Sequence, residues 1–300
     1  MASTARISPH SPSMAMSVSV TFWGTRGTIP VPGQGTVRYG GNTPCVSVRD
    51  GDGHCLILDA GTGIRRLGNE LAANASTGRV DLFLSHVHWD HIQGLPFFSP
   101  MYAERQEIFV HGPTPVAASL GDVLDRQLDP AVYPVPRAAR PARLTVQELG
   151  PGDEVEIPGF RVQSFQLSHP GGALGYRITP KRGGPAVAFL TDNELGPGGA
   201  TRVPAGWRNA LTTFVGGAAL LIHDGMYTPA LQEERPGWGH SNALDAVALA
   251  AEASVRELTL FHHDPEHDDG QVDALLAMAR AAAPEGLTVS AAREGWTVTL

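Results

Sequence analysis

The segment Ser85–His91, with the sequence Ser-His-Val-His-Trp-Asp-His, holds four side chains of the types that bind metal ions. It follows an apolar run that predicts a strand, so it lies on the loop at that strand's carboxyl end, where functional sites are commonly built. His86 and His88 are two positions apart and project to the same side of an extended chain. Asp90 and His91 then turn toward a second position. Imidazole and carboxylate ligands suit zinc, and also manganese or iron, so the segment predicts a pair of ions.

A pair of metal ions needs further ligands from elsewhere in the chain. His169, Asp192 and His262 each come directly after an apolar run that predicts a buried strand. Taken alone, each of them is equally well explained as an ordinary loop or turn residue. Because strand ends at one edge of a sheet meet, we expect the three to join the first segment and complete its ligand set.

The elements that must position these side chains are short strands punctuated by glycine and proline. We expect strands over residues 19–23, 45–49, 55–59, 81–84, 108–111, 144–148, 154–157, 160–167, 174–178, 187–190, 220–223, 257–261 and 295–300. We expect helices over residues 64–73, 116–128, 243–253 and 272–283. This order predicts an α/β fold of two similar halves, with two sheets face to face and helices outside, formed as one domain by residues 18–300 after a disordered tail, residues 1–17.

Composition excludes several classes of protein. The 300 residues carry a formal charge of −8 and include a single lysine, Lys181, so no basic block is present to grip the phosphates of a nucleic acid. The sequence has no apolar run of about 18 residues, the length that predicts a membrane span. Its first residues lack the apolar core of a secretory signal, so we expect a cytoplasmic protein. The chain has 12 histidines, and histidine is the usual residue for metal binding or proton transfer, so this number favours one of those roles.

The pattern His-x-His-x-Asp-His, followed at a distance by His, Asp and His, resembles the metallo-β-lactamase superfamily of metal-dependent hydrolases. The resemblance extends from about Val20 to the carboxyl terminus, and Asp59 stands where the family has a buried aspartate that supports the ligands. It implies an αββα sandwich and two divalent ions, zinc in the first place and manganese or iron as alternatives. It also implies the ligands of each ion: His86, His88 and His169 for one, Asp90, His91 and His262 for the other, and Asp192 between them.

Within the superfamily, the chain is most similar to the ribonuclease Z and cyclic-phosphate phosphodiesterase branch. That branch has a Gly-His-Ser/Thr turn, here at His240, and a carboxylate after an earlier strand, here Asp224 in place of the usual glutamate. The resemblance implies that His240 protonates the leaving group with Asp224 holding it, and that Asp90 accepts a proton from water. His263 rivals His262 as the last ligand. We favour His262 because it directly follows the strand and keeps the family's interval from His240.

The substrate can be narrowed by what the chain lacks. Only 22 residues separate His169 from Asp192, which leaves no room for the arm that ribonuclease Z proteins of this branch use for transfer RNA. We therefore expect a small phosphodiester, either a cyclic nucleotide or a phosphoribosyl cyclic phosphate, attacked by metal-bound hydroxide, and no structured nucleic acid. Hydrolysis of a lactone, thioester or β-lactam is one alternative, and a non-catalytic metal-binding or sensor protein is another.

Two segments have less definite expectations. The stretch 112–141 carries no catalytic residue and is expected to form a pocket wall or the contact of a homodimer. Arg26, in a glycine-rich turn, is expected either to touch a phosphate or to be solvated.

Overall fold

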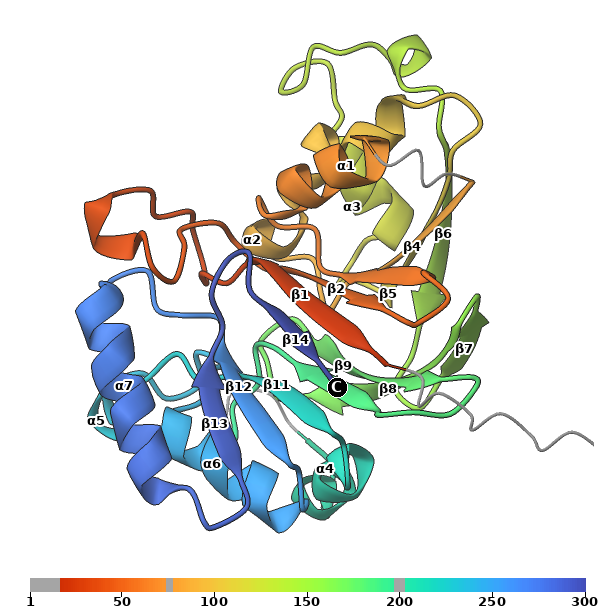
Figure 1. Cartoon of the computed structure of the whole chain (residues 1–300). Coiled ribbons are helices and arrows are strands. Elements are labelled where there is room, and N and C mark those ends of the chain that lie inside the picture. Colours follow the sequence, from red (N-terminus) through yellow and green to blue (C-terminus); the bar gives the residue numbers. More distant parts are fainter. Residues whose placement is uncertain (1–16, 74–77, 197–202) are drawn as a thin grey trace, which may run out of the picture.

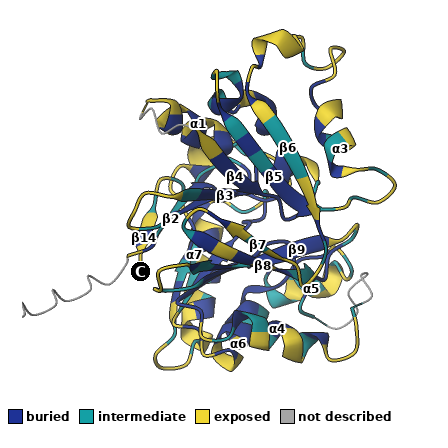
Figure 2. Ribbon diagram, turned by 90° about the vertical axis from the view of Figure 1, so that its right-hand side faces the viewer, coloured by how far each residue is buried: buried dark blue, intermediate teal, exposed yellow. Residues whose placement is uncertain are grey.

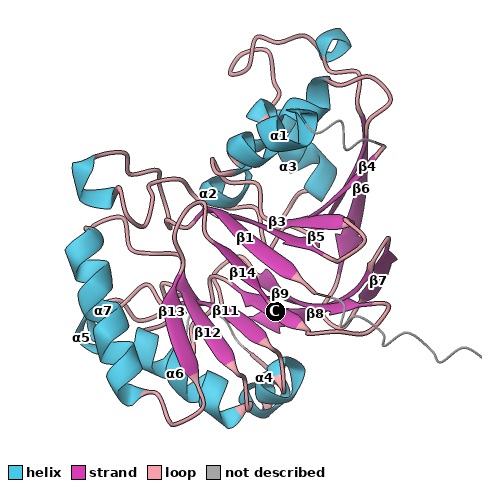
Figure 3. Ribbon diagram, in the orientation of Figure 1, coloured by secondary structure: helices cyan, strands magenta, loops and turns pink. Residues whose placement is uncertain are grey.

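Two sheets pack face to face, and helices cover both outer surfaces of the pair (Figures 1 and 3). This computed structural model describes residues 17–73, 78–196 and 203–300. The arrangement is the αββα sandwich that the sequence predicts. The expected disordered tail, apart from Ser17, lies outside the described residues. Within the described part, no helix is both long and apolar enough to span a membrane.

The first sheet has seven strands in the order β14-β1-β2-β3-β4-β5-β6. The strands are β1 (Ser19–Gly24), β2 (Cys45–Arg49), β3 (Cys55–Leu58), β4 (Arg79–Phe83), β5 (Glu107–Pro113), β6 (Arg143–Leu149) and β14 (Thr297–Thr299). Strands β3 to β6 run parallel to one another, and β1 pairs antiparallel with β2 and β14. The helical segments between them are η1 (Gln34–Thr36), α1 (Ile64–Ala73), α2 (Trp89–Ile92), η2 (Leu95–Phe97), η3 (Ser99–Tyr102), α3 (Leu120–Arg126) and η4 (Arg137–Ala139).

The second sheet also has seven strands, in the order β13-β12-β11-β10-β9-β8-β7. They are β7 (Glu154–Ile157), β8 (Phe160–Leu167), β9 (Ala173–Pro180), β10 (Val187–Leu190), β11 (Leu220–Asp224), β12 (Glu257–Phe261) and β13 (Thr288–Ala291). Strands β10 to β13 are parallel, whereas β7 to β10 are antiparallel. The helices of this half are α4 (Trp207–Val215), α5 (Pro229–Glu234), α6 (Ala243–Glu252) and α7 (Asp269–Ala282).

The main core lies between the two sheets, where the central strands are mostly buried, whereas strands β6 and β7 also carry exposed residues (Figure 2). Phe22 of β1 and Phe189 of β10 both pack on Phe261 of β12, with ring centroids 6.1 and 5.7 Å apart. Burial of large aromatic side chains from both sheets gives the interface the apolar area that holds the halves together. The two halves therefore form one rigid support for loops at their shared edge.

The structure corrects some predicted elements. The helix expected over 116–128 begins only at Leu120, because Ser119 caps it and its hydroxyl accepts a hydrogen bond from the Asp122 amide at 3.1 Å. Helices α4 and α5 and strand β13 were not predicted. In α4 the buried residues Trp207, Leu211 and Val215 recur every four positions, which is the helical pattern that the prediction missed.

Candidate metal centre

The seven predicted ligands gather in one cluster at the carboxyl ends of the strands, and we call it the histidine–aspartate cluster. It draws on loops after β4, β8, β10 and β12 and on the short helix α2. Six of the seven side chains are buried, and His88 is exposed. Ligand atoms within the groups of this cluster lie within 4.8 Å of one another. The members are His86, His88, Asp90, His91, His169, Asp192 and His262.

The carboxylate of Asp192 lies in the middle of the cluster and turns one oxygen to each half. Its Oδ2 is 3.7 Å from Nε2 of His86 and 3.7 Å from Nε2 of His169. Its Oδ1 is 3.2 Å from Nε2 of His91 and 3.2 Å from Nε2 of His262. The cluster is therefore divided into two ligand groups that share one carboxylate.

Each group is completed by one more side chain. His88 joins the first, with its Nδ1 3.1 Å from Nε2 of His169. Asp90 joins the second, and its Oδ2 is 3.1 Å from Nε2 of His262 and 3.2 Å from Nε2 of His91. The two groups contain the residues that the family resemblance assigns to the two ions, and their role as metal ligands stays a prediction.

The protonation states fit a metal site. Burial, reinforced by the neighbouring His91, lowers the pKa of His86 well below its ordinary value, and burial lowers the pKa of His169 to about 4. Burial opposes the charge on Asp192, yet attraction by His262 and His91 holds its pKa well below the usual range. Among the described residues, Nε2 of His86 is buried without a hydrogen-bond partner. The unprotonated imidazoles of His86 and His169 beside the ionised carboxylate of Asp192 are the forms that bind divalent cations.

His91 shows how much negative charge gathers here. Burial opposes its protonation, but Asp90, Asp192 and Asp59 together raise its pKa well above the ordinary value. A place that holds a proton so strongly attracts a metal cation for the same electrostatic reason.

Residues behind the cluster fix the ring orientations. Nδ1 of His91 donates to Asp59 at 2.8 Å, and Asp59 also accepts bonds from the amide and hydroxyl of Ser85 at 2.7 and 3.0 Å. Nδ1 of His169 donates to the carbonyl of Gly239 at 3.0 Å. Each bond leaves Nε2 facing the cluster, as carboxylates and carbonyls do for metal-binding histidines.

The backbone is strained at three of these positions. Asp59, Asp192 and His262 have φ values of 60°, 51° and 59°, in the left-handed region that non-glycine residues rarely adopt. Such conformations cost about 1–3 kcal/mol each and collect at functional sites. These strained conformations orient two of the clustered side chains, Asp192 and His262, and the supporting carboxylate of Asp59, at a cost in folding stability.

A hydrogen-bonded pair of residues, His240 and Asp224, borders the cluster. Nδ1 of His240 donates to Oδ2 of Asp224 at 2.7 Å, and the ring of His240 stacks on that of His262 with centroids 5.1 Å apart. Burial disfavours the charged form of His240, but attraction and hydrogen bonding by Asp224 outweigh it and raise the pKa to about 9. The shorter side chain of Asp224 thus reaches His240 without the glutamate of the family pattern.

Two open questions from the sequence are decided by position. His263 points away from the cluster and donates from Nε2 to the carbonyl of Ala292 at 2.8 Å, so His262 is the one in the cluster. Arg26 is fully buried and donates to the carbonyls of Gly40, Asp264 and His267, so both expectations for it, phosphate contact or solvation, are wrong.

Two residues that the sequence analysis missed support the site. Glu194 is buried and accepts hydrogen bonds from the amides of Gly237 and Gly239 at 2.9 and 3.0 Å, which holds the turn before His240. The amide of Thr28 donates to Asp90 at 2.8 Å. The available signal for Glu194 was its place in the polar run that starts at the end of β10.

A pocket of about 670 Å³ opens above the cluster. Its walls include the exposed indoles of Trp89 and Trp238, together with Tyr227 and Arg235. The Arg235 guanidinium lies 5.3 Å from the centroids of both Tyr227 and Trp238, and it pairs with the buried Asp264 at 3.2 Å. The pocket has the size of small-molecule sites.

Comparison with known proteins agrees with this geometry. A family model described as the beta-lactamase superfamily domain matches residues 54–263. The chain is 25% identical to a ribonuclease Z of Natronomonas pharaonis over 82% of this chain and 87% of that protein. In fold it is similar to the metallo-beta-lactamase fold protein YhfI of Bacillus subtilis, with a TM-score of 0.68, 20% identity and coverage of 95% of this chain and 99% of that one.

Human tRNase Z, short form, has the same fold, with a TM-score of 0.62, 22% identity and coverage of 93% of this chain and 98% of that one. The family model spans more than two thirds of the chain and includes all seven clustered residues. The chain therefore belongs to the β-lactamase superfamily and is a hydrolase of the metallo-β-lactamase fold.

Proposed function

We propose that the chain is a dinuclear metal-dependent phosphodiesterase that acts on a small phosphodiester. The observation that carries the proposal is the Asp192 carboxylate, which presents one oxygen to each of two histidine groups. In this proposal His86, His88 and His169 would hold the first ion, Asp90, His91 and His262 would hold the second, and Asp192 would contribute to both. Zinc suits this ligand set best, and manganese and iron are alternatives.

Bound divalent ions would lower the pKa of a nearby water and neutralise the phosphate charge. The protein's own part begins with Asp90. Its Oδ2 is held by the Thr28 amide and lies at the wall of the pocket, where it can accept a proton from the attacking water.

In this proposal His240 donates the proton that the leaving group needs. Its Nδ1 is engaged by Asp224, so Nε2 is the nitrogen left to face the substrate. Asp224 is in turn fixed by the Met226 amide at 2.9 Å, which keeps the imidazole oriented. We infer that His240 protonates the departing alkoxide and that Asp224 is its positioning residue.

The pocket walls favour a substrate with an aromatic group. Trp238 is 60% exposed, although Arg235 packs against its ring and fixes it in place. Trp89 lines the same pocket and is 70% exposed. Solvent-facing indoles at a pocket wall are stacking surfaces for nucleobases, which supports a cyclic nucleotide as substrate.

The region between the third and the bridging ligand supports a small substrate over RNA. Residues 170–191 contain β9, β10 and the turn that joins them, with no added arm. The charge of −8 and the single lysine also disfavour a phosphate-tracking surface. Because relatives of this chain are ribonuclease Z proteins, RNA is the competing substrate class, and an experiment must compare it with small diesters.

The test is a substrate panel on the metal-loaded protein: bis-p-nitrophenyl phosphate, 2′,3′- and 3′,5′-cyclic nucleotides, a phosphoribosyl cyclic phosphate, a precursor transfer RNA, and a lactone and a thioester. We expect turnover of small diesters that a chelator abolishes and that added zinc or manganese restores. Turnover of the lactone or thioester without any diester would refute the proposal. Faster cleavage of the transfer RNA than of any small diester would refute the substrate class.

A further inference from the structure

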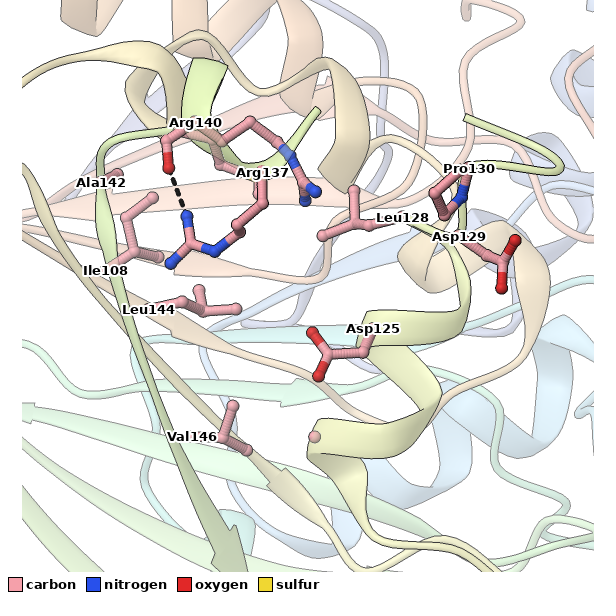
Figure 4. A pocket seen from close by; sticks show the side chains of 12 residues that line it. Ile108, Asp125, Leu128, Asp129, Pro130, Arg137, Arg140, Ala142, Leu144 and Val146 are labelled. Atoms are coloured by element: carbon pink, nitrogen blue, oxygen red, sulfur yellow. Dashed lines mark hydrogen bonds between the residues drawn. The ribbon is translucent and has the colours of Figure 1, made fainter. Parts of the chain in front are cut away.

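A second pocket, of about 520 Å³, lies on the outer side of the first sheet, and we call it the outer pocket (Figure 4). It is enclosed by η3, β5, α3, η4 and β6, and none of the seven clustered residues lines it. Several residues of the segment 112–141, which was expected to form a pocket wall or a dimer contact, line this pocket. The later residues of the segment, from Gly121 to Arg140, form the roof and one end of this pocket. Its earlier residues, 113–118, instead line a separate pocket beside His86 and His88.

The floor of the outer pocket is apolar. Leu144 and Val146 of β6 and Ala142 just before it project to the same face, because alternate residues of a strand share a face. Ile108 of β5 and Met101 of η3 extend this surface, and both are buried. A ligand body that covers this floor must itself be apolar to gain from the contact.

Arg140 lies at one end of the pocket, and it makes no ion pair with the part of the chain that the structure describes. Its residue is 6% exposed, and Nε is buried without a hydrogen-bond partner. Among the described residues, no carboxylate lies within salt-bridge distance of its guanidinium. A buried N–H group without a hydrogen-bond partner is costly, so native structures normally supply an acceptor for a group such as Nε of Arg140. The missing partner is best explained by a ligand from solution.

The other charged side chains of the pocket limit the kind of anion. Arg137 lies beside Arg140 and donates to its carbonyl, whereas Asp125 lies on the opposite side and points into the pocket (Figure 4). Asp129 is also in the lining. Two carboxylates so close would repel a phosphate dianion more strongly than a single negative charge.

We propose that the outer pocket binds a small monocarboxylic acid with an apolar body. The planar carboxylate pairs with the fork of the Arg140 guanidinium, which matches it in geometry. The apolar body covers Ile108, Leu144 and Val146, and Asp125 accepts an ammonium group where the acid carries one. The site is separate from the histidine–aspartate cluster, and the proposal does not depend on the reaction catalysed there.

The test is methyl NMR of the full-length, metal-loaded protein carrying ¹³C-methyl methionine. Met101 lines the outer pocket and Met226 lines the pocket above the cluster, so each reports on one site. The probes are phenylacetate and isovalerate, with phenylacetamide and methyl phosphate for comparison. We expect saturable shifts of the Met101 methyl with the two carboxylates, at least about 10-fold weaker binding of the amide and of methyl phosphate, and no matching change at Met226.

Variants locate the carboxylate. Arg140→Met keeps the volume and removes the charge, so it should weaken binding by at least about 10-fold. Val146→Phe narrows the floor without altering Arg140 and should also weaken binding, which keeps the test decisive if the first variant does not fold. Arg143→Gln changes an exposed arginine of the same strand and should bind like the parent. Equal affinity for phenylacetamide, binding that survives in Arg140→Met, or shifts at Met226 alone would overturn the proposal.

Discussion

The histidine–aspartate cluster and the outer pocket differ in how the charge of their buried side chains is compensated. In the cluster, five imidazoles and two carboxylates converge from several strand ends and compensate one another. In the outer pocket, Nε of Arg140 is buried without a hydrogen-bond partner, and no carboxylate of the described residues lies within salt-bridge distance of its guanidinium. The charged groups of the first region pair with one another, whereas we propose that an anion from solution pairs with Arg140 in the second.

The two regions differ in the kind of backbone that positions their side chains: strand ends in the cluster and a long connection in the outer pocket. Strand ends bring many side chains to one place, so a shared ligand there is held by redundant contacts. A long connection such as residues 112–141 brings few side chains together, so one unpaired group dominates the chemistry of its pocket. Changes in the cluster should therefore act on catalysis and metal content, and changes in the outer pocket should leave both intact.

The largest effect is expected from Asp192→Ala. This change removes the carboxylate that contacts both ligand groups, and we expect kcat to fall by at least about 10³-fold with loss of bound metal. Metal content by mass spectrometry and turnover of a cyclic nucleotide are the measurements.

The matched control is Asp125→Asn, which removes a carboxylate from the outer pocket instead. It should retain the metal content and kcat of the parent. Full metal content in Asp192→Ala would show that the two groups do not share this ligand.

A smaller loss is expected from His240→Ala. If His240 protonates the leaving group, kcat should fall about 10²–10⁴-fold for substrates with alkoxide leaving groups. The loss should be much less for bis-p-nitrophenyl phosphate, because p-nitrophenolate leaves without a proton.

Asp224→Asn should show the same dependence on leaving group to a lesser degree, since it acts by holding His240. His54→Ala alters an exposed histidine and should have no effect. Equal losses for both substrates in His240→Ala would mean that this residue does not donate the proton.

Trp238→Ala tests the pocket walls rather than the chemistry. Loss of a stacking surface should raise KM for a cyclic nucleotide by about 10-fold and leave kcat nearly unchanged. KM for a phosphoribosyl cyclic phosphate, which has no base, should stay the same. Phe97→Ala removes another exposed aromatic ring, outside this pocket, as the control. An equal rise in KM for both substrates would argue against base stacking.

The smallest effect is expected from Ser119→Ala, which removes the cap of α3. We expect the free energy of unfolding, measured by chemical denaturation, to fall by about 1 kcal/mol because the helix loses its cap. Metal content should be unchanged, because Ser119 is not one of the clustered residues. Asp122→Ala removes only the weaker reciprocal bond, 3.4 Å long, and should cost less. A larger loss from Asp122→Ala than from Ser119→Ala would show that the hydroxyl is not the main cap.

Much of the fold could be predicted because its signals are local. Strands β7, β8, β10 and β12 and helix α1 have the predicted bounds, since each is an apolar run with a clear period and a turn signal at its end. Helices α4 and α5 were missed, as was β13, whose sequence Thr-Val-Ser-Ala holds only one large apolar residue and so gives little strand signal. The ligand types were likewise visible, because a metal needs particular side chains at particular spacings.

The sequence by itself determined which residues can bind metal and which strands carry them, because ligand chemistry and hydrophobic periodicity are local properties. Only the tertiary structure decided between His262 and His263, because the two differ by the direction in which the backbone turns after β12. It also decided that Arg26 is buried and bonded to backbone carbonyls, and that Nε of Arg140 is buried without a hydrogen-bond partner among the described residues. Burial and pairing of a charge depend on which distant segments surround it, and no local pattern encodes that.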